Sequence, residues 1–312
     1  MIDLDRMEEQ LASALTLGAR PAPKPATHAS APVPAPPPAP APASVALPPR
    51  RRQRAVAPEP PRPARPAAGL PASPAELLES GLVEEADAAM ARAGHPRDAL
   101  CWATMRALLE GRQDAARTGI DELRRLADRT DDPHALDRWW LQRFWTAFEW
   151  GGDEERLDVL DHCRARAYRF DDLTWWGNLT LLLAAMGKGD EATRAFDDAS
   201  ALVARAGADR QRLDVDVTTN LVEAATILGD PGRADAAARL LHVPDGRLVV
   251  VGDGAVCKGS VDRYRALGHV AGGRWAQAGE CFRRAESVHR ALGAAPLLAR
   301  TLEQASRASV AA

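Results

Sequence analysis

The segment GAVCKGSVDRY, residues 254–264, gathers residue types that bind phosphate or act as nucleophiles: two glycines, a cysteine, a lysine and a serine. A phosphate loop needs the order G-x-x-x-x-G-K-[ST], because its backbone N–H groups surround the phosphates and its lysine reaches across them. Here the glycine follows the lysine. A nucleophilic Cys257 would need a base, and no pattern places His242 or His269, the nearest histidines in sequence, against it. We therefore expect a helix entry with Ser260 as N-cap.

Metal and disulfide chemistry have equally little support. The seven histidines show no H-x-x-x-H or H-E-x-x-H spacing, and the four cysteines lie far apart with no C-x-x-C pair. Acidic pairs such as Asp131-Asp132 and Asp171-Asp172 are explained by helix capping. We predict free thiols in a reducing cytosol, no catalytic residue, no cofactor and no metal site, and hence a protein that is not an enzyme.

Tryptophan is concentrated in one region, since six of the eight lie between residues 139 and 176. Both Trp-Trp pairs lie near the start of the first helix of a predicted hairpin, and adjacent helix residues point about 100° apart. One ring of each pair can therefore enter the core while the other faces an inner surface. Two interpretations stay open, core packing alone or the floor of a groove for a peptide or small ligand. The groove candidates are Arg138, Trp139, Arg143, Trp175 and Asn178.

The first quarter of the chain differs from the rest in composition. Residues 21–74 hold 19 of the 24 prolines, so we predict a disordered Pro/Ala-rich linker over residues 20–73. This linker carries eight basic residues and one acidic residue, in a chain of net charge −3. Residues 1–19 predict a short amphipathic docking helix with its apolar stripe on Leu4, Met7, Leu11 and Leu15. The overall charge favours neither direct DNA binding nor a membrane surface, and no apolar run is long enough to span a bilayer.

From residue 74 to residue 312 the pattern is helical and repetitive. Ser73, Pro74 and Glu76 predict a capped helix that ends at Gly94. Turn signals EGRQDAA, WGGDEER, MGKGDEA, GDPGRADAA and GGRWAQA then recur at intervals of 36 to 44 residues. Each is followed by small and apolar residues in one frame, which starts at Ala116, Arg156, Ala192, Ala236 and Ala278. This period predicts an all-α fold, a right-handed tetratricopeptide-like solenoid of about five helical hairpins. Residues 242–260 interrupt it, and Arg247–Val251 is β-prone.

The blocks VVVGDGAVCKGSVDRY, GRWAQAGECFRRA and LGAAPLLARTL carry a resemblance. Together with the repeats from about residue 95 to residue 308, they resemble the tetratricopeptide-like region of large ATP-binding LuxR-class regulators and related bacterial cyclase and AAA-ATPase signalling proteins. The ATPase and helix-turn-helix domains of that family have no counterpart in this sequence. The resemblance therefore implies a sensor or interaction surface. The family more often has Arg-Tyr-Leu-Gly where Arg263-Tyr264-Arg265-Ala266 stands here, so we expect a solvated helix face at this point.

The function that follows is a cytoplasmic, non-catalytic scaffold or sensor. Its solenoid is expected to bind a protein segment or a small effector, while the tethered helix docks onto a partner or folds back onto the solenoid. The alternative is a transcription-associated regulatory protein that acts through DNA-binding partners. A protein partner is expected in either case.

Overall fold

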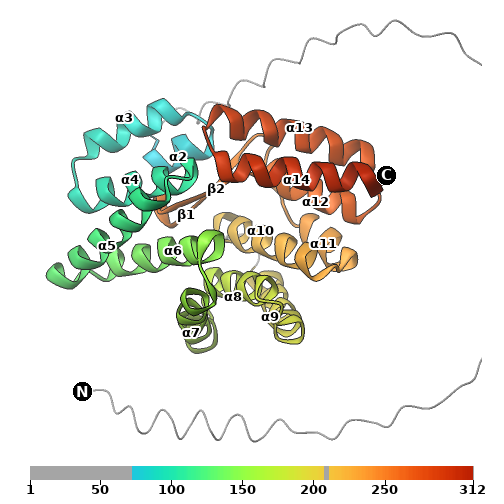
Figure 1. Ribbon diagram of the computed structural model, residues 1–312, viewed down its shortest axis with the longest axis horizontal. Coiled ribbons are helices and arrows are strands. Elements are labelled where there is room, and N and C mark those ends of the chain that lie inside the picture. The colour runs from blue at the N-terminus through green and yellow to red at the C-terminus, as the bar shows by residue number, and fades with distance from the viewer. Residues whose placement is uncertain (1–71, 207–210, 312) are drawn as a thin grey trace, which may run out of the picture. The chain divides into compact units, whose positions relative to one another are not determined.

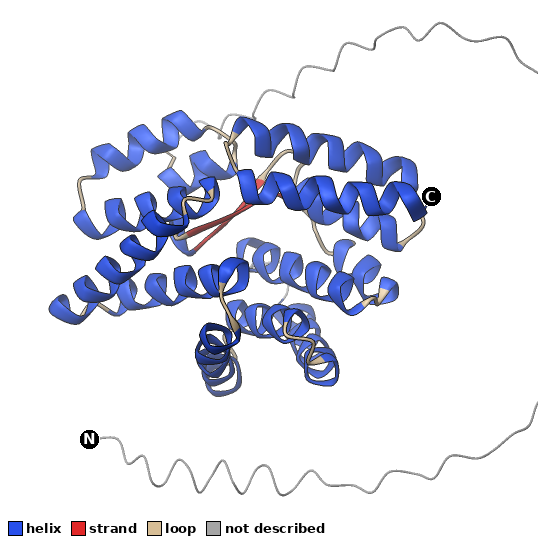
Figure 2. Cartoon of the chain, in the orientation of Figure 1, coloured by secondary structure: helices blue, strands red, loops and turns tan. Residues whose placement is uncertain are grey.

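The computed structural model describes residues 72–206 and 211–311, with side chains over 72–205 and 215–311. The predicted docking helix, with Leu4, Met7, Leu11 and Leu15, and residues 20–71 of the linker lie outside these ranges. The described part of the chain is all-α apart from one two-stranded sheet, as predicted (Figures 1 and 2).

The first half of the domain consists of two short leading helices and three helical hairpins. The predicted leading helix is in fact two helices, because Gly81 takes a left-handed φ of 75° and breaks it; the Ser73 capping box and the Gly94 end are confirmed. The elements are α2 (Pro74–Glu79), α3 (Val83–Ala93), α4 (Pro96–Glu110), α5 (Gln113–Thr130), α6 (Pro133–Trp150), α7 (Asp153–Phe170), α8 (Leu173–Ala185) and α9 (Gly189–Ala206).

The second half holds two further hairpins, the sheet and a last helix that the sequence analysis did not distinguish. Its elements are α10 (Gln211–Leu228), α11 (Pro231–Ala238), β1 (Leu248–Val251), the 3-10 turn η2 (Gly252–Gly254), β2 (Val256–Ser260), α12 (Val261–Ala271), α13 (Trp275–Ala291) and α14 (Ala295–Ala311). The β-prone segment is confirmed as β1. Its antiparallel partner β2 was not predicted, because the sequence analysis expected only a helix entry at Ser260 there.

All five predicted turn signals separate two helices of a hairpin, so these breaks are confirmed. Gly111, Gly187, Gly229 and Gly273 have φ between 68° and 77°, the left-handed conformation that ends a helix at low cost. The small-and-apolar frame is buried on α5, α9 and α13. It is wrong for the fourth hairpin, where Ala236 and Leu240 are exposed. The buried positions there are instead Ala234 and Ala237 on α11, which ends at Ala238, and Leu241 shortly after it.

Helices that follow one another in sequence pack against one another, as expected for stacked hairpins. In addition, α14 contacts α4, and the turn after α4 at Gly111 lies against Pro296. The β1–β2 hairpin lies inside this arrangement and contacts α2, α4, α6, α10, α12 and α13 (Figure 1). A single β-hairpin therefore meets both ends of the described helical array. That the array is a right-handed tetratricopeptide-type superhelix stays a prediction.

Candidate functional site

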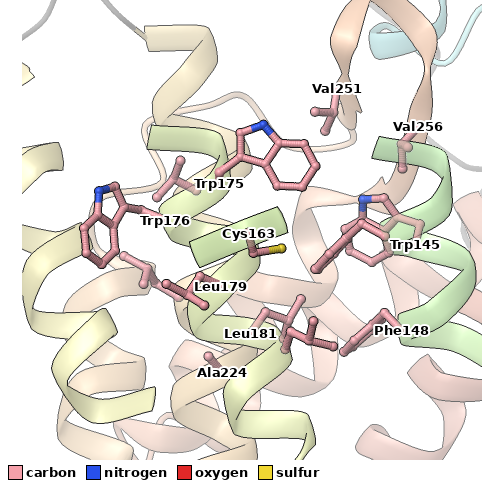
Figure 3. Close-up of a cluster of buried hydrophobic side chains, with 14 of the residues drawn as sticks. Trp145, Phe148, Cys163, Trp175, Trp176, Leu179, Leu181, Ala224, Val251 and Val256 are labelled. Carbon is pink, nitrogen blue, oxygen red and sulfur yellow. The ribbon is translucent and has the colours of Figure 1, made fainter. Parts of the chain in front are cut away.

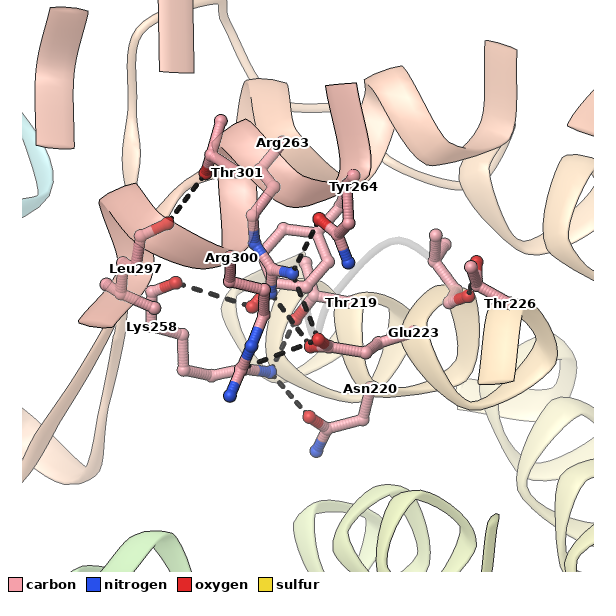
Figure 4. Close-up of polar contacts among 12 residues, drawn as sticks. Thr219, Asn220, Glu223, Thr226, Lys258, Arg263, Tyr264, Leu297, Arg300 and Thr301 are labelled. Carbon is pink, nitrogen blue, oxygen red and sulfur yellow. Dashed lines mark hydrogen bonds and ion pairs between the residues drawn. The ribbon is translucent and has the colours of Figure 1, made fainter. Parts of the chain in front are cut away.

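A network of charged and polar side chains surrounds the end of β2 inside the helical domain (Figure 4). Its members on α10 recur every three or four residues, which places them on one face of that helix. Partners from β2, α12 and α14 reach this face. We call the network the polar core; it comprises Asp216, Thr219, Asn220, Glu223, Lys258, Arg263, Tyr264 and Arg300.

Lys258 is the centre of this network, and none of its side chain is exposed. Its Nζ donates to the backbone oxygen of Asp216 and to Asp216 Oδ1, both at 2.9 Å, and to Thr219 Oγ1 and Asn220 Oδ1 at 2.5 and 2.7 Å. An ammonium group has three N–H donors, so these four acceptors saturate it. Burial lowers the pKa of Lys258, and the Asp216 carboxylate opposes that shift. The lysine therefore fastens β2 to α10.

Arg263, on α12, makes the second ion pair. Its partner Glu223 lies two turns after Asp216 on α10. The Arg263 guanidinium donates to both carboxylate oxygens of Glu223, at 2.9 and 2.8 Å, which is the bidentate geometry that suits arginine. Burial alone would raise the pKa of Glu223, but Arg263 and Arg300 outweigh it and hold the pKa at about 2. The expected solvated face at Arg263–Ala266 is therefore wrong, since Arg263, Tyr264 and Ala266 are all buried. A buried carboxylate 40 residues away keeps the arginine inside.

Arg300, on α14, extends the network to α6. It donates to Glu149 Oε2 at 2.6 Å and lies 3.5 Å from Glu223 Oε1, so α14 is linked to α6 and α10. Burial raises the pKa of Glu149, and Arg300 opposes the shift. Counted with Glu149, the network holds three cationic side chains and three carboxylates, and it carries no formal net charge.

Ser260 and His289 fasten the other side of β2. Ser260 is the N-cap of α12, as predicted, because its hydroxyl accepts from the amide of Asp262. The Ser260 amide itself donates to His289 Nε2 at 2.9 Å, so the His289 proton lies on Nδ1, 3.0 Å from Thr301 Oγ1. Burial lowers the pKa of His289 to about 3, which keeps the ring neutral.

A cavity of about 380 Å³ opens beside the polar core, between α2, the start of α10, β1 and the segment before β1. Apolar and polar groups share its wall, and Asp216 joins the cavity to the network. Among residues with described side chains, its other polar groups are carried by α2 and by the segment before β1. The lining residues are Glu79, Val215, Asp216, His242, Val243, Pro244, Arg247, Leu248, Val249 and Val250.

Lys258 and Cys257, the two reactive side chains on β2, are both buried. The Lys258 ammonium is enclosed by acceptors, and burial raises the pKa of the Cys257 thiol to about 11, far from a thiolate at neutral pH. All four cysteines are buried and free. Within the described ranges, no group of three His, Cys, Asp or Glu side chains is placed to hold a metal ion, and no helix is long and apolar enough to cross a membrane.

The five predicted groove residues do not share one open surface. Trp139 and Trp175 are 9 % and 3 % exposed and pack in the hydrophobic core, where Figure 3 shows Trp175 near Val251. Asn178 is buried and accepts from Asn220 at 2.9 Å. Arg138 pairs with Asp98, and Arg143 pairs with Asp158 while it lines a smaller cavity of about 130 Å³.

The prediction that one ring of each Trp-Trp pair faces away from the core is correct for one of the two pairs. Trp139 is buried while Trp140 is partly exposed and stacks on His162, with ring centroids 3.7 Å apart. Trp175 and Trp176 are both buried, so the prediction is wrong for the second pair. On α8 almost every position is covered by neighbouring helices, and no face is left for an outward ring.

Sequence reasoning missed the polar core. One signal was available, because Asp216, Asn220 and Glu223 recur on one face of an otherwise apolar helical pattern. Comparison of the chain with protein-family models, with curated proteins and with solved structures found no match.

Proposed function

We propose that this protein is a non-catalytic sensor that binds a small effector in the cavity between α2, α10 and β1. The observation that carries the proposal is the cavity itself. Its volume of about 380 Å³ falls within the range of about 300–1,000 Å³ that small-molecule sites occupy, and its wall combines apolar and polar groups. A sensor also needs a contact through which ligand binding can affect the rest of the fold. Asp216 supplies one, because it lines the cavity and accepts from Lys258.

The small effector is favoured over a peptide in the tryptophan groove, because Trp139, Trp175 and Asn178 are buried. A tethered docking helix and a role beside DNA-binding partners stay predictions.

The test is a screen of a small-metabolite library against the full chain by thermal unfolding. A ligand present at 100 times its Kd stabilises the folded state by about 2.7 kcal/mol, which raises Tm by several degrees in a domain of this size. The Val243→Trp variant, which fills the cavity, should abolish that rise. Val203→Trp, at a half-buried valine on α9, is the matched control. No stabilising compound, or equal stabilisation of both variants, would overturn the proposal.

A further inference from the structure

The C-terminal end of α7 carries two exposed aromatic side chains, which we call the aromatic pair. Tyr168 and Phe170 are 61 % and 67 % exposed, the highest values for large aromatic residues in the described part of the chain. The Tyr168 ring stands edge-on against buried Trp176, with centroids 4.7 Å apart, and the Arg166 guanidinium lies 5.6 Å from the centre of the Phe170 ring. Both rings therefore have a fixed contact on one side and stay open to solvent elsewhere. Exposed apolar groups of this kind mark binding surfaces.

The charged groups around the aromatic pair favour a basic partner. Arg164 and Arg166 each pair with two different carboxylates, so two cations stand against four anions and leave a charge of −2. Complementary charge steers a partner towards such a surface and orients it there. The other charged neighbours cancel, and they are Arg169, Arg194, Asp171 and Asp198.

A basic, proline-rich segment of this chain has the matching chemistry. Residues 58–66 read PEPPRPARP, with five prolines, two arginines and one glutamate. A polyproline II helix has three residues per turn. Every third residue from Pro60 to Pro66 is proline, so these rings share one edge of such a helix, and Arg62 and Arg65 share the next. Aromatic surfaces bind segments of this kind, because the preformed helix loses little entropy on binding.

The short connection to the domain decides which copy supplies the segment. Only residues 67–71 separate it from Ala72, where the described chain begins, and a fully extended connection of this length spans about 22 Å. The β1–β2 hairpin and α6 lie between α2 and α7 (Figure 1), and α2 contacts β1, β2 contacts α6, and α6 contacts α7. Three successive packing distances of about 10 Å exceed the reach of the connection. The segment therefore has to come from another copy.

We infer that the aromatic pair binds residues 58–66 of a second copy of this chain in polyproline II form. Tyr168 and Phe170 pack on the proline edge, and the two arginines of the segment face the acidic surroundings. The contact is heterologous, because the surface and the segment are different parts of the chain, so it joins copies head to tail. It uses none of the residues that line the cavity and is independent of the proposed effector site.

The first test titrates the full chain into a fluorescein-labelled peptide of residues 57–67 and follows fluorescence anisotropy. Tyr168→Ala and Phe170→Ala should each weaken peptide binding about tenfold, as expected for aromatic residues at the centre of an interface. Leu157→Ala is the matched control, because Leu157 is 47 % exposed on the same helix but lies about three turns before the aromatic pair. Circular dichroism checks that the three variants are folded.

The second test concerns the segment and the copy that supplies it. A peptide with Pro60, Pro63 and Pro66 replaced by alanine keeps every charge and should not bind. In sedimentation velocity, the full chain should self-associate above the Kd of the peptide, and the chain with the same three substitutions should stay monomeric.

Three results would overturn the inference. The aromatic contact is refuted if Tyr168→Ala and Phe170→Ala bind the peptide as tightly as Leu157→Ala does. The proline edge is refuted if the alanine peptide binds like the parent peptide. The second copy is refuted if the full chain stays monomeric above the peptide Kd.

Discussion

Replacing Lys258 by methionine tests whether the polar core holds the β-hairpin in place. Methionine has nearly the length of lysine, so the change removes the ammonium group and leaves little empty volume. Asp216 Oδ1 loses its cation, and Thr219 and Asn220 each lose a hydrogen bond. Removal of one partner of a buried ion pair costs about 3–5 kcal/mol, because the other charge stays buried without compensation. We therefore expect Lys258→Met to lower the free energy of unfolding by about that amount, a large share of the total for a domain.

A second substitution separates the ion pair from the loss of packing. Asp216→Asn removes the charge that Lys258→Met leaves behind, and the amide keeps nearly the same shape. The double variant should therefore recover part of the stability that Lys258→Met loses. Residues in direct contact give coupling energies of 0.5–3 kcal/mol, and this pair should lie near the upper end because the Lys258 side chain is fully buried and that of Asp216 is only 6 % exposed.

The matched control is Arg307→Met on α14. Arg307 also pairs with a carboxylate, that of Glu303, but its side chain is 78 % exposed. Exposed i,i+4 pairs contribute about 0.3–0.5 kcal/mol, so this variant should be almost as stable as the parent protein. Urea unfolding followed by circular dichroism measures the parent protein, Lys258→Met, Asp216→Asn, the double variant and Arg307→Met, with the denaturant slope checked for constancy. If Lys258→Met costs no more than Arg307→Met, or if the double variant shows no coupling, the hairpin is not held by this pair.

Two further predictions concern the opposite side of β2. Gly259→Ala should destabilise the protein by about 2–4 kcal/mol, because Gly259 has a φ of 79° and an added Cβ would lie 2.3 Å from His289 Nε2. The control is Gly273→Ala, which has a φ of 68° and nothing within 4 Å, and which should cost only about 1–2 kcal/mol in chemical denaturation. Equal losses of unfolding free energy in the two variants would contradict a close contact between Gly259 and His289. His289, whose pKa burial lowers to about 3, should make the protein less stable in acid. As the pH falls, the unfolded chain takes up the proton first, at about pH 6.5, whereas the folded protein takes it up only near pH 3. The stability present above pH 6.5 is therefore lost progressively down to about pH 3, and the loss is about 2 kcal/mol at pH 5. His289→Gln should remove this part of the pH dependence between pH 6.5 and 5 in unfolding titrations, and an unchanged slope would show that other groups cause it.

Local signals predicted most of the helical framework. Glycine at Gly111, Gly187 and Gly273 ends helices because only glycine adopts the left-handed conformation at low cost, and this property needs no knowledge of the rest of the chain. The caps at Ser73 and Ser260 are equally local, since each hydroxyl accepts from an amide two or three residues later.

The polar core could not be predicted in the same way. Lysine and arginine are buried only when a partner compensates them, so a local pattern assigns Lys258 and Arg263 to solvent. Their partners lie about 40 residues earlier, on a helix whose position depends on the packing of several hairpins. The same dependence explains the groove prediction. Trp175 and Asn178 are covered by helices that the local sequence does not place.

The positions of the two buried ion pairs suggest what the charged side chains beside the cavity do for the fold. An apolar β-hairpin can slide against an apolar helix at little cost, whereas Lys258 and Arg263 each meet one carboxylate on α10, at Asp216 and Glu223. These two pairs, about two helical turns apart on α10, hold β2 through Lys258 and the start of α12 through Arg263, and β1, which pairs with β2, forms part of the cavity wall. Under the proposed function, a ligand that stabilises Asp216 in its present position also stabilises the docked hairpin. By linkage, a substitution that lowers the population of the docked hairpin weakens ligand binding by the factor by which that population falls.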